Sequence, residues 1–314
     1  MDSLQEIVPN NNYPEIAILI LNWNNYPDTR ICLESLEKLS YPAFKIILVD
    51  NGSSDGSREK LREEFPELTL LESDRNLGFA GGNNIGLRYI LEVGIPYTLL
   101  LNNDTEVIQP DFLEQILRVM DGDREVCAVG PKVVRENGEP DQVILPFPSL
   151  DMTLRNSLGL YRQRLEQKQT VDSLIGCCVL VRNQAVRQVG LLDENYFMYV
   201  EETEWFYRMR KQGWSVLYYP VESVIHKGGS SAKKLEDSQV YVERRSNVIY
   251  TLVKHGYLLQ AGATGLFMLL MLVFRVVTDY FRPNLRRERY TGSIFSAFIS
   301  AVSRKVKLAR RSGV

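Results

Sequence analysis

Short, continuous apolar runs recur along the first two-thirds of the chain. Residues 16–21 and 45–49 are apolar without the alternation of a half-exposed strand, which predicts strands buried on both faces of a sheet. Three further runs of this kind lie at 68–71, at 97–101 and from Cys127 onwards. Segments with helical spacing separate the runs, at 28–39, 57–64, 82–92 and after Pro110, which is expected to open its helix. Strands alternating with helices predict right-handed βαβ units and a mostly parallel sheet.

The pattern becomes less regular after residue 137. Residues 137–170 mix proline, glycine and charged residues, which predicts loops with a short helix. Asn183 is then expected to cap a helix that ends at Gly190, and another helix is expected over 201–212. Further apolar runs lie at 174–181, 215–219 and 224–226, and the last two predict strands.

Polar clusters come directly after three of these strands, at 22–25, 50–55 and 102–105. In parallel α/β sheets, ligands bind beyond the carboxyl ends of the strands. We therefore expect three strand ends to present polar groups to one crevice. This recurrence is the first indication of a ligand site.

The overall composition is that of an ordinary globular protein. The chain has 314 residues, of which 45% are hydrophobic and 24% charged, so it can bury a sizeable core. The formal net charge of −2 argues against a polyanion-binding protein, and no nucleic-acid partner is expected. The charge is uneven, because ten basic and two acidic residues from Arg275 onwards give the tail +8 and leave −10 for the rest.

The segment 256–314 combines this positive charge with apolar residues. Its apolar stretch of 17 residues at 258–274 is at the lower limit of the roughly 17–25 residues of a membrane-spanning helix. A buried core helix or an oligomer contact would give the same pattern. Residues 294–302 are apolar on one side and run into a basic end, as interfacial helices do. The segment therefore predicts a helical extension that attaches peripherally to an anionic membrane surface.

The four cysteines, Cys32, Cys127, Cys177 and Cys178, lack the CxxC spacing of a metal site, and the adjacent pair is poorly placed to form a disulfide. The N-terminus has no basic stretch followed by an apolar one, so no secretory signal is expected. Reduced cysteines without such a signal predict a location on the cytoplasmic face of the cell membrane.

The sequence Asn102-Asn103-Asp104 closes the strand at 97–101. A hard cation such as Mn²⁺ or Mg²⁺ prefers oxygen ligands and commonly takes one or two carboxylates together with substrate phosphates. Asp104 suits that part, and Asn103 could hold water or sugar hydroxyls. Asn and Asp also favour ordinary turns, so the motif alone leaves both interpretations open.

Three carboxylates, Glu201, Glu202 and Glu204, begin the helix expected at 201–212. Acidic residues in a first turn can simply complement the helix dipole. These three follow an aromatic segment at 197–199 and are expected to crowd together, which can raise one pKa into the range of a general base. Glu202 is expected to point where the helix packs.

His226, one of two histidines, follows the strand at 224–226 and precedes Gly228-Gly229-Ser230-Ser231. An amide-rich loop suits phosphate oxygens and imidazole can ligate a metal, although a lone histidine after a strand is more often structural. Asp50 could accept a hydrogen bond from a nucleotide base, or could be a turn former. The glycines at 78–82 lack the GxGxxG spacing, so a dinucleotide fingerprint is not supported.

These motifs, taken in order, resemble the family 2 inverting glycosyltransferases of the GT-A fold, in the bacterial rhamnosyltransferase-like subgroup. The resemblance covers residues 14–255 and includes, weakly, the segment 243–247 (ERRSN). The motifs that carry it are LNWN (21–24), VDNGSSD (49–55), NLGFAGGNN (76–84), LNND (101–104), GLLDE (190–194), EETE (201–204) and HKGGSS (226–231).

The resemblance implies a donor site and a metal. Asp50 would bind the nucleotide base and Asn22 would line the same pocket, while Asp104 and His226 would hold Mn²⁺ or Mg²⁺ on the diphosphate. Further donor contacts are implied for Asn24, Asn76, Gly82, Asn83, Asn102 and Asn103. The family's metal motif DxD begins here with Asn102, so one carboxylate is left for the cation.

On the acceptor side, the resemblance implies that Glu202 is the catalytic base, at a position where the family usually has Asp, with Glu201 as the alternative. Gly176 and Cys177 would lie in the acceptor-side loop. The implied reaction is inverting, because Glu202 takes a proton from the acceptor hydroxyl while that hydroxyl attacks the sugar from the face opposite the leaving diphosphate.

We expect an α/β chain with a Rossmann-like GT-A domain in two halves and a helical, membrane-associating extension. Residues 14–125 would bind the nucleotide sugar, 126–255 would bind the acceptor and carry the catalytic carboxylate, and 256–314 would contact the membrane. The implied donor is dTDP-rhamnose or a UDP-sugar. The acceptor would be a saccharide or lipid-linked hydroxyl in cell-envelope polysaccharide synthesis.

Two alternative functions stay open from the residues. A nucleotidyltransferase acting on nucleotide sugars would show a glycine-rich, basic loop after the first strand, where Asn22-Trp23-Asn24-Asn25 stands instead. A non-catalytic module that binds a sugar or a partner could keep the same fold, and the incomplete DxD leaves room for it.

Overall fold

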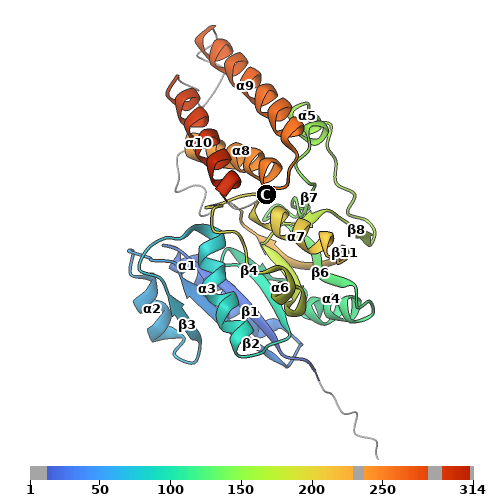
Figure 1. Ribbon diagram of the computed structural model, residues 1–314. Helices are drawn as coiled ribbons and strands as arrows, with labels where there is room; N and C mark the ends of the chain where they lie inside the picture. The colour runs from blue at the N-terminus through green and yellow to red at the C-terminus, as the bar shows by residue number, and fades with distance from the viewer. Residues whose placement is uncertain (1–12, 229–236, 282–291, 312–314) are drawn as a thin grey trace, which may run out of the picture.

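The computed structural model describes residues 13–228, 237–281 and 292–311 (Figure 1). Its centre is a β-sheet with the strand order β3-β2-β1-β4-β10-β6-β11-β5, and β8 (Gln169–Thr170) pairs with β11 beside this path. The other strands are β1 (Ile16–Asn22), β2 (Phe44–Asp50), β3 (Thr69–Glu72), β4 (Tyr97–Asn102), β5 (Thr105–Val107), β6 (Val126–Val134), β10 (Cys178–Arg182) and β11 (Ser215–His226).

The N-terminal part of the sheet is parallel, as the alternation of strands and helices predicts. β1 pairs in parallel with β2 and β4, and β2 pairs in parallel with β3. Residues 16–20 of β1 are 0% exposed, so this strand is buried on both faces as expected. The register places Asn22 beside Asp50, and Leu21 beside Asn102. The polar ends of three strands are therefore level at one sheet edge, as expected, and the crevice between them stays a prediction.

The other part of the sheet is mixed. β10 runs antiparallel to both β4 and β6, whereas β11 is parallel to β6. β11 is one continuous strand, although the sequence predicts two strands at 215–219 and 224–226. Its register against β6 shifts between Tyr218 and Glu222, and this irregularity accounts for the interrupted apolar pattern.

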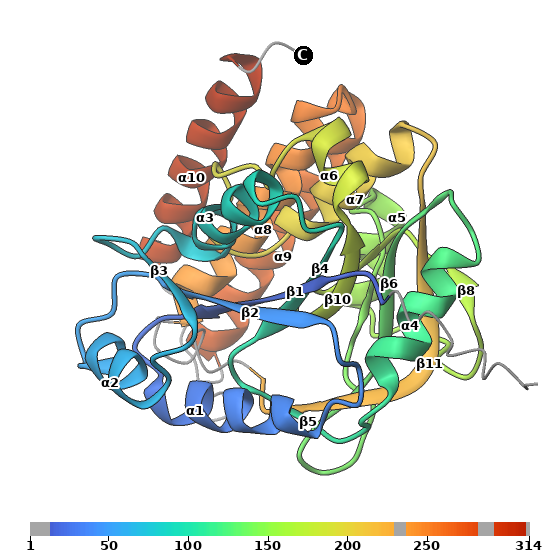
Figure 2. The ribbon, with the colours of Figure 1, turned by 90° about the horizontal axis from the view of Figure 1, so that it is seen from below.

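Helices cover both faces of the sheet. In Figure 2, α3, α6 and α7 lie on one face, and α1 and α2 lie on the other. The helices of this part are α1 (Tyr26–Ser35), α2 (Ser57–Glu64), α3 (Gly78–Glu92), α4 (Phe112–Asp121), α6 (Asn183–Val189) and α7 (Glu201–Lys211). The helix predicted at 28–39 ends at Ser35 and continues as a short 3-10 turn, Leu36–Lys38.

Two predicted helix starts are wrong. Pro110 precedes α4 instead of opening it, and its carbonyl accepts a hydrogen bond from the Ser40 N–H at 3.0 Å. Asn183 is the first residue of α6 and does not cap it. Its buried side chain donates to the Ile95 carbonyl at 2.7 Å and accepts from the Thr98 hydroxyl at 2.8 Å. Both residues join separate elements, which a local capping pattern does not reveal.

The segment 137–170 has little regular structure, as expected. It contains the short helix α5 (Leu150–Ser157) and the strand β7 (Ile144–Leu145), which pairs with β9 (Ser173–Leu174) in a small separate sheet. This segment also contributes Asp141 to the site described below.

Three helices follow the sheet: α8 (Asp237–Lys254), α9 (Leu258–Phe281) and α10 (Gly292–Arg311). They share an apolar cluster formed by Ile249, Met268, Leu272 and Phe298, and α9 and α10 extend away from the sheet (Figure 1). The expected helical extension is confirmed over the described part of 256–314. No helix among those described residues is long and apolar enough to cross a bilayer. The expected division at 125/126 and 255/256 stays a prediction.

All four cysteines are free and buried. Burial raises the pKa of the Cys32, Cys127 and Cys178 thiols to about 12, so these thiols stay protonated and unreactive near neutral pH.

Candidate active site

The carboxyl ends of β1 and β2 meet at Asn22 and Asp50. Asn22 Nδ2 donates to Asp50 Oδ2 at 2.9 Å, and the Ser53 N–H and the Arg58 guanidinium donate to Asp50 Oδ1 at 3.0 and 3.3 Å. A carboxylate has about four acceptor positions, so Asp50 can accept one more hydrogen bond. The Asp50 residue is 0% exposed, and a nucleotide base reaches it only if its neighbours move. Its role in base binding stays a prediction.

A buried network connects β1 with α1 and with the loop after β4. The Thr29 hydroxyl donates to Asn22 Oδ1 at 2.9 Å, and Asn103 Nδ2 donates to Thr29 Oγ1 at 2.8 Å. Asn103 is 6% exposed. Its amide group therefore holds this edge of the sheet together, and its predicted contact with the donor sugar would need the carbonyl oxygen of the same side chain.

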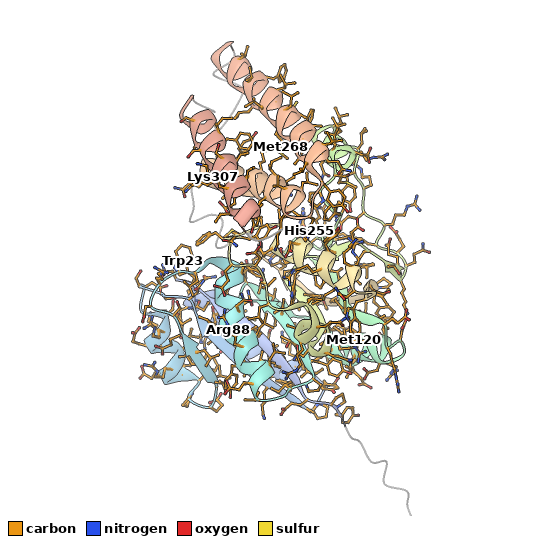
Figure 3. The ribbon with its side chains drawn as sticks, viewed as in Figure 1. Trp23, Arg88, Met120, His255, Met268 and Lys307 are labelled. Atoms are coloured by element: carbon orange, nitrogen blue, oxygen red, sulfur yellow. The ribbon has the colours of Figure 1, made fainter. Side chains whose placement is uncertain are left out.

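Asn24 lies in the left-handed region, with φ of 51°. Its side-chain oxygen accepts from the Ser54 N–H at 2.7 Å, and its own N–H donates to the Ser53 hydroxyl at 2.9 Å. Figure 3 places its neighbour Trp23 at the sheet edge that faces the C-terminal helices. Asn24 thus connects the loops that follow β1 and β2, beside the predicted donor pocket.

The turn between β3 and α3 is built on Asn51 and Asn76. Asn51 Nδ2 donates to Asn76 Oδ1 and to the Gly78 carbonyl, both at 3.0 Å, and Asn76 Oδ1 also accepts from the Gly78 N–H at 2.8 Å. A Cβ on Gly82 would lie 2.5 Å from Leu21 Cδ1, so a larger residue there would displace the Leu21 side chain where α3 packs on β1. The structure therefore gives Gly82 a packing contact, and its donor contact stays a prediction.

The Asn83 side chain also makes a hydrogen bond within the protein. Its side chain is buried, and Nδ2 donates to the Phe79 carbonyl at 2.9 Å within α3. The predicted donor contact of Asn83 is not tested by this arrangement.

His226 lies between two carboxylates at the end of β11. Its Nε2 is 3.3 Å from Asp104 Oδ1, and its Nδ1 is 2.8 Å from Asp141 Oδ2. Asn102 Nδ2 lies 3.4 Å from His226 Nε2. Burial lowers the pKa of His226, but the hydrogen bonds with Asp104 and Asp141 outweigh it and raise the pKa to about 9. The structure thus brings together Asn102, Asp104 and His226, as the resemblance implies.

Asp141 was not singled out by the sequence. It lies in the loop-rich segment after β6, 85 positions before His226, and no local motif surrounds it. Burial raises the pKa of its carboxyl, but the hydrogen bonds from His226 and Arg135 and the Gln142 N–H outweigh it and lower the pKa to about 2.

The donor groups at this point fit a hard cation. Asp104 offers carboxylate oxygen and His226 offers imidazole nitrogen, and both residues are almost fully buried, at 5% and 6% exposure. Within the described ranges, no group of three or more His, Cys, Asp or Glu side chains is arranged to hold a metal by itself. Asp104 and His226 therefore fit a Mn²⁺ or Mg²⁺ ion whose other ligands are diphosphate oxygens and water, once His226 has lost its proton.

Of the predicted phosphate-binding loop, only Gly228 belongs to the described residues, with a φ of 71°. Gly229, Ser230 and Ser231 lie outside them. Lys227, directly after His226, pairs with Asp28 at 2.6 Å.

Glu202 lies in the first turn of α7, and Gly176 lies against it. The Gly176 N–H donates to Glu202 Oε1 at 3.1 Å. A Cβ on Gly176 would lie 2.7 Å from Phe79 Cζ and 3.2 Å from Glu202 Oε1, so no larger residue fits there without movement. Burial raises the pKa of Glu202 above its usual value. Gly176, expected on the acceptor side, is therefore in contact with the candidate base.

The next residue connects Glu202 with the end of β4. The Cys177 carbonyl accepts from the Asn102 N–H at 2.9 Å, while the Cys177 side chain is buried. The segment 176–177 thus touches both the candidate base and the strand end that leads to Asp104. An acceptor could meet Cys177 only through its backbone unless the loop moves.

Glu201 is the more buried partner of the pair, at 2% exposure. Burial and the charge of Glu202 raise the pKa of Glu201 well above its usual value. Its Oε2 is a buried oxygen without a hydrogen-bond partner among the described residues. The charge of Glu202 thus acts on Glu201, which agrees with the expected crowding of these two carboxylates.

Glu204 does not belong to this group. It is 0% exposed, and its carboxylate pairs with Arg208 at 3.0 Å, Lys254 at 2.8 Å and His255 at 3.0 Å. Burial raises its pKa, but these three partners outweigh burial and lower it. The prediction of three crowded carboxylates is therefore wrong for Glu204, because it points to α8, where His255 marks the end of the helix in Figure 3.

The residues before α7 have an unusual backbone. Tyr199 and Val200 have φ values of 70° and 76°, in the left-handed region that favours glycine. Each such residue costs on the order of 1–3 kcal/mol and persists only when its surroundings hold it. From α8, the buried Asn247 donates through Nδ2 to the carbonyls of Met198 and Tyr199, both at 2.9 Å. The sequence pointed to Asn247 only through the weak ERRSN resemblance.

A family model described as "Glycosyl transferase family 2" matches residues 17–190, more than half of the chain. The chain is 27% identical over 240 residues to "Low-salt glycan biosynthesis hexosyltransferase Agl10" from Haloferax volcanii, and the match covers 75% of each protein. It is also 27% identical over 261 residues to "N-acetylglucosaminyl-diphospho-decaprenol L-rhamnosyltransferase" from Mycobacterium tuberculosis, covering 77% of this chain and 85% of that protein.

One solved structure with a similar fold is "Mannosyltransferase PcManGT from Pyrobaculum calidifontis in complex with GDP-Man and Mn2+". The TM-score is 0.54 at 16% identity, and the match covers 95% of this chain and 88% of the other. At this identity the likeness supports the fold, an α/β sheet of the GT-A type, and the fold alone.

Proposed function

The chain belongs to glycosyl transferase family 2, and from this premise we propose that it is an inverting, metal-dependent enzyme that transfers a sugar from a nucleotide sugar to an acceptor hydroxyl in cell-envelope glycan synthesis. The observation that carries the proposal is the position of Glu202. Its buried carboxylate, held by the Gly176 N–H, is connected through Cys177 to the strand end that leads to Asp104.

Glu202 acts as the base. Glu202 Oε1 is engaged by the Gly176 N–H, so Oε2 takes the proton of the acceptor hydroxyl. The raised pKa of this buried carboxyl makes it a stronger base than an exposed glutamate. Burial and the charge of Glu202 also raise the pKa of the neighbouring Glu201. The contact of Glu202 with the Gly176 N–H, in the loop expected on the acceptor side, favours Glu202 over Glu201 as the base.

The transfer reaction forms one bond and breaks one bond at the anomeric carbon of the donor sugar. The acceptor oxygen forms a bond to the anomeric carbon from the face opposite the diphosphate, the carbon–oxygen bond to the diphosphate breaks, and the nucleoside diphosphate leaves with the electron pair. The acceptor proton goes to Glu202. Holding both substrates in one crevice supplies the proximity that the reaction needs.

Asp50 and Asn22 bind the nucleotide base, and Asp104 and His226 hold Mn²⁺ or Mg²⁺. The cation, when bound, neutralises negative charge on the departing diphosphate. His226 is held in place by Asp141, whose contact at 2.8 Å fixes the orientation of the imidazole ring.

The donor is dTDP-rhamnose. Support comes from the similarity, at 27% identity, to the L-rhamnosyltransferase of M. tuberculosis, together with the motif order of the rhamnosyltransferase-like subgroup. The acceptor is a saccharide or lipid-linked hydroxyl.

A donor panel tests this function. Purified protein is incubated with dTDP-rhamnose or UDP-hexoses, with a lipid-linked saccharide acceptor, and with Mn²⁺, Mg²⁺ or chelator. We expect metal-dependent transfer from dTDP-rhamnose, reduced about 10³-fold in Glu202→Gln, within the range observed for general bases. Glu92→Gln, an exposed carboxyl at the end of α3, is the matched control. Transfer from UDP-hexoses alone would overturn the donor assignment, and donor binding without turnover under any metal would favour a binding module.

The protein attaches peripherally to the cytoplasmic face of the membrane through α9. Leu259, Leu266, Leu270 and Phe274 of this helix are 59–92% exposed, and the basic tail supplies attraction to anionic lipid. Replacing Leu259, Leu266 and Leu270 together by Glu should abolish sedimentation with vesicles of phosphatidylglycerol and phosphatidylethanolamine. Val93→Glu, an exposed apolar residue after α3, is the control. Unchanged sedimentation of the triple variant would contradict the assignment.

A further inference from the structure

The turn that leads into α7 is held from two sides. On one side, the Phe79 N–H donates to the Phe197 carbonyl at 2.8 Å. A Cβ on Gly78 would lie 2.1 Å from that same carbonyl oxygen, so only glycine allows α3 to approach so closely. These contacts fix the start of the turn, two residues before the left-handed pair Tyr199–Val200.

On the other side, α8 holds the turn through Asn247. This side chain is fully buried, and its Nδ2 donates to the Met198 and Tyr199 carbonyls, each at 2.9 Å. Both amide protons are used, and they engage the two peptide groups that flank Tyr199. Rotation of either peptide group away from its present orientation breaks one of these hydrogen bonds.

Asn247 belongs to a polar stripe on one face of α8. Residues 247, 250, 251 and 254 follow the helical spacing that places side chains on one face. Tyr250 and Lys254 contact Asp193 at 2.9 and 2.7 Å, and the Thr251 and Tyr196 hydroxyls are 2.8 Å apart. The stripe therefore follows the segment 193–199 along its length, and Asn247 is its member nearest to the left-handed residues.

We propose that Asn247 is a positioning residue of the transfer reaction: its amide holds the Tyr199–Val200 turn in its left-handed form and thereby fixes the direction in which Glu202 projects from α7. The inference rests on the proposed role of Glu202 and adds a residue, from a helix outside the matched residues 17–190, on which that role depends. Tyrosine and the β-branched valine rarely adopt this backbone without support. When the two hydrogen bonds are removed, the turn relaxes and the carboxylate moves.

The first test separates binding from chemistry. In Asn247→Ala we expect kcat to fall about 10²-fold, the loss that a displacement of about 1 Å can cause. The dissociation constant of the donor with Mn²⁺ should stay within about twofold, because the Asn247 amide hydrogen-bonds the turn before α7 and not the residues assigned to the donor. Gln239→Ala, an exposed residue of the same helix, is the control and should resemble the wild type.

A second variant tests the mechanism of positioning. Glycine adopts positive φ without a steric penalty, so Val200→Gly in the Asn247→Ala background should recover kcat by about tenfold. A purely structural role of Asn247 in packing α8 would not be relieved by a change at residue 200. Unchanged kcat in Asn247→Ala, or a double variant no better than the single one, would overturn the proposal.

Hydrogen exchange of the segment 196–204 gives a readout independent of turnover. We expect faster exchange there in Asn247→Ala than in the wild type and in Gln239→Ala. If Asn247→Ala fails to fold, Asn247→Ser, which keeps one donor, replaces it in the same comparison. Absence of transfer by the wild-type protein would refute the proposed function, whereas unaltered exchange of 196–204 would refute the positioning role by itself.

Discussion

Two regions at the same edge of the sheet satisfy their polar groups in opposite ways. At the ends of β1 and β2, Asn22, Thr29 and Asp50 are fully buried and hydrogen-bonded to one another in a chain. At the start of α7, Glu201 has a buried oxygen without a partner in the described part of the chain, and Tyr199 and Val200 have left-handed backbones.

The comparison shows two ways in which buried polar groups are accommodated at this edge. The hydrogen-bonded network stabilises the fold, and a ligand can reach Asp50 only by moving part of that network. A crowded pair of carboxyls in a strained turn is unfavourable for stability but raises the pKa that a general base needs. The predictions below test whether the two regions differ in this way.

The largest effect is expected from the third carboxylate of α7. Glu204→Gln removes the carboxylate charge that Arg208, Lys254 and His255 share, and we expect a loss of about 3 kcal/mol in the free energy of unfolding. Chemical denaturation at pH 7 measures it. If the loss is smaller than that of an exposed pair, about 0–1 kcal/mol, the distinction between Glu204 and the Glu201–Glu202 pair fails.

The same variant has a defined pH dependence. The folded-state pKa of Glu204 is lowered, so its stabilisation is present above the unfolded-state pKa and is lost as the pH falls through the folded-state pKa. The wild type should therefore lose more stability than Glu204→Gln as the pH falls from 5 towards 3. Parallel curves for the two proteins would contradict this assignment.

Gly176→Ala tests the contact between the acceptor-side loop and the base. The added Cβ would meet Phe79 and Glu202, so we expect kcat to fall about 10²-fold through displacement of the carboxylate. Donor affinity should be retained, and isothermal titration with the donor and Mn²⁺ measures it. Gly262→Ala is the matched control, because nothing lies within 4 Å of its Cβ position and, like Gly176, it has no positive φ. An equal fall in kcat in both variants would point to a general loss of stability.

Asn22→Ala tests the hydrogen-bonded network at the ends of β1 and β2. It removes one hydrogen bond each from Asp50 and Thr29, which keep other partners, and a lost hydrogen bond of this kind costs about 0.5–1.5 kcal/mol. We expect a loss of stability of that order together with weaker donor binding. If binding weakens while stability is unchanged, Asn22 serves the ligand and not the network.

The smallest effect on stability is expected at Glu201, where substitution should not destabilise the protein. Its folded-state pKa is raised, so the stability of the wild type declines as the pH rises above the unfolded-state pKa towards the folded-state pKa. Glu201→Gln should remove that decline and be at least as stable as the wild type at pH 8. Thermal unfolding between pH 5 and pH 8 checks it, and a destabilised Glu201→Gln would show that this carboxylate is satisfied after all.

Local patterns were sufficient for much of the fold. The helix predicted at 57–64 agrees with α2, and the runs at 16–21 and 97–101 each end one residue before the strand does. The motif order was also sufficient for the family. The failures lie at residues whose hydrogen bonds leave their own segment, such as Asn183, which binds Ile95 and Thr98 instead of capping α6.

The candidate site likewise contains residues that local patterns predicted and residues that depend on distant partners. The polar clusters after β1, β2 and β4 were found from the sequence, because parallel strands carry their ends to one edge. The contacts of Asp141 with His226, of Glu204 with His255 and of Asn247 with Tyr199 were not, because each depends on a partner 48 to 85 positions away.

The sequence by itself therefore determined which elements form, which polar residues meet at the sheet edge and which family the chain resembles, since these follow from short-range periodicity and motif order. Only the tertiary structure decided which carboxylates are paired and which are crowded. The charge state of a buried group depends on the atoms that surround it in space, and residues far apart in the chain supply those atoms.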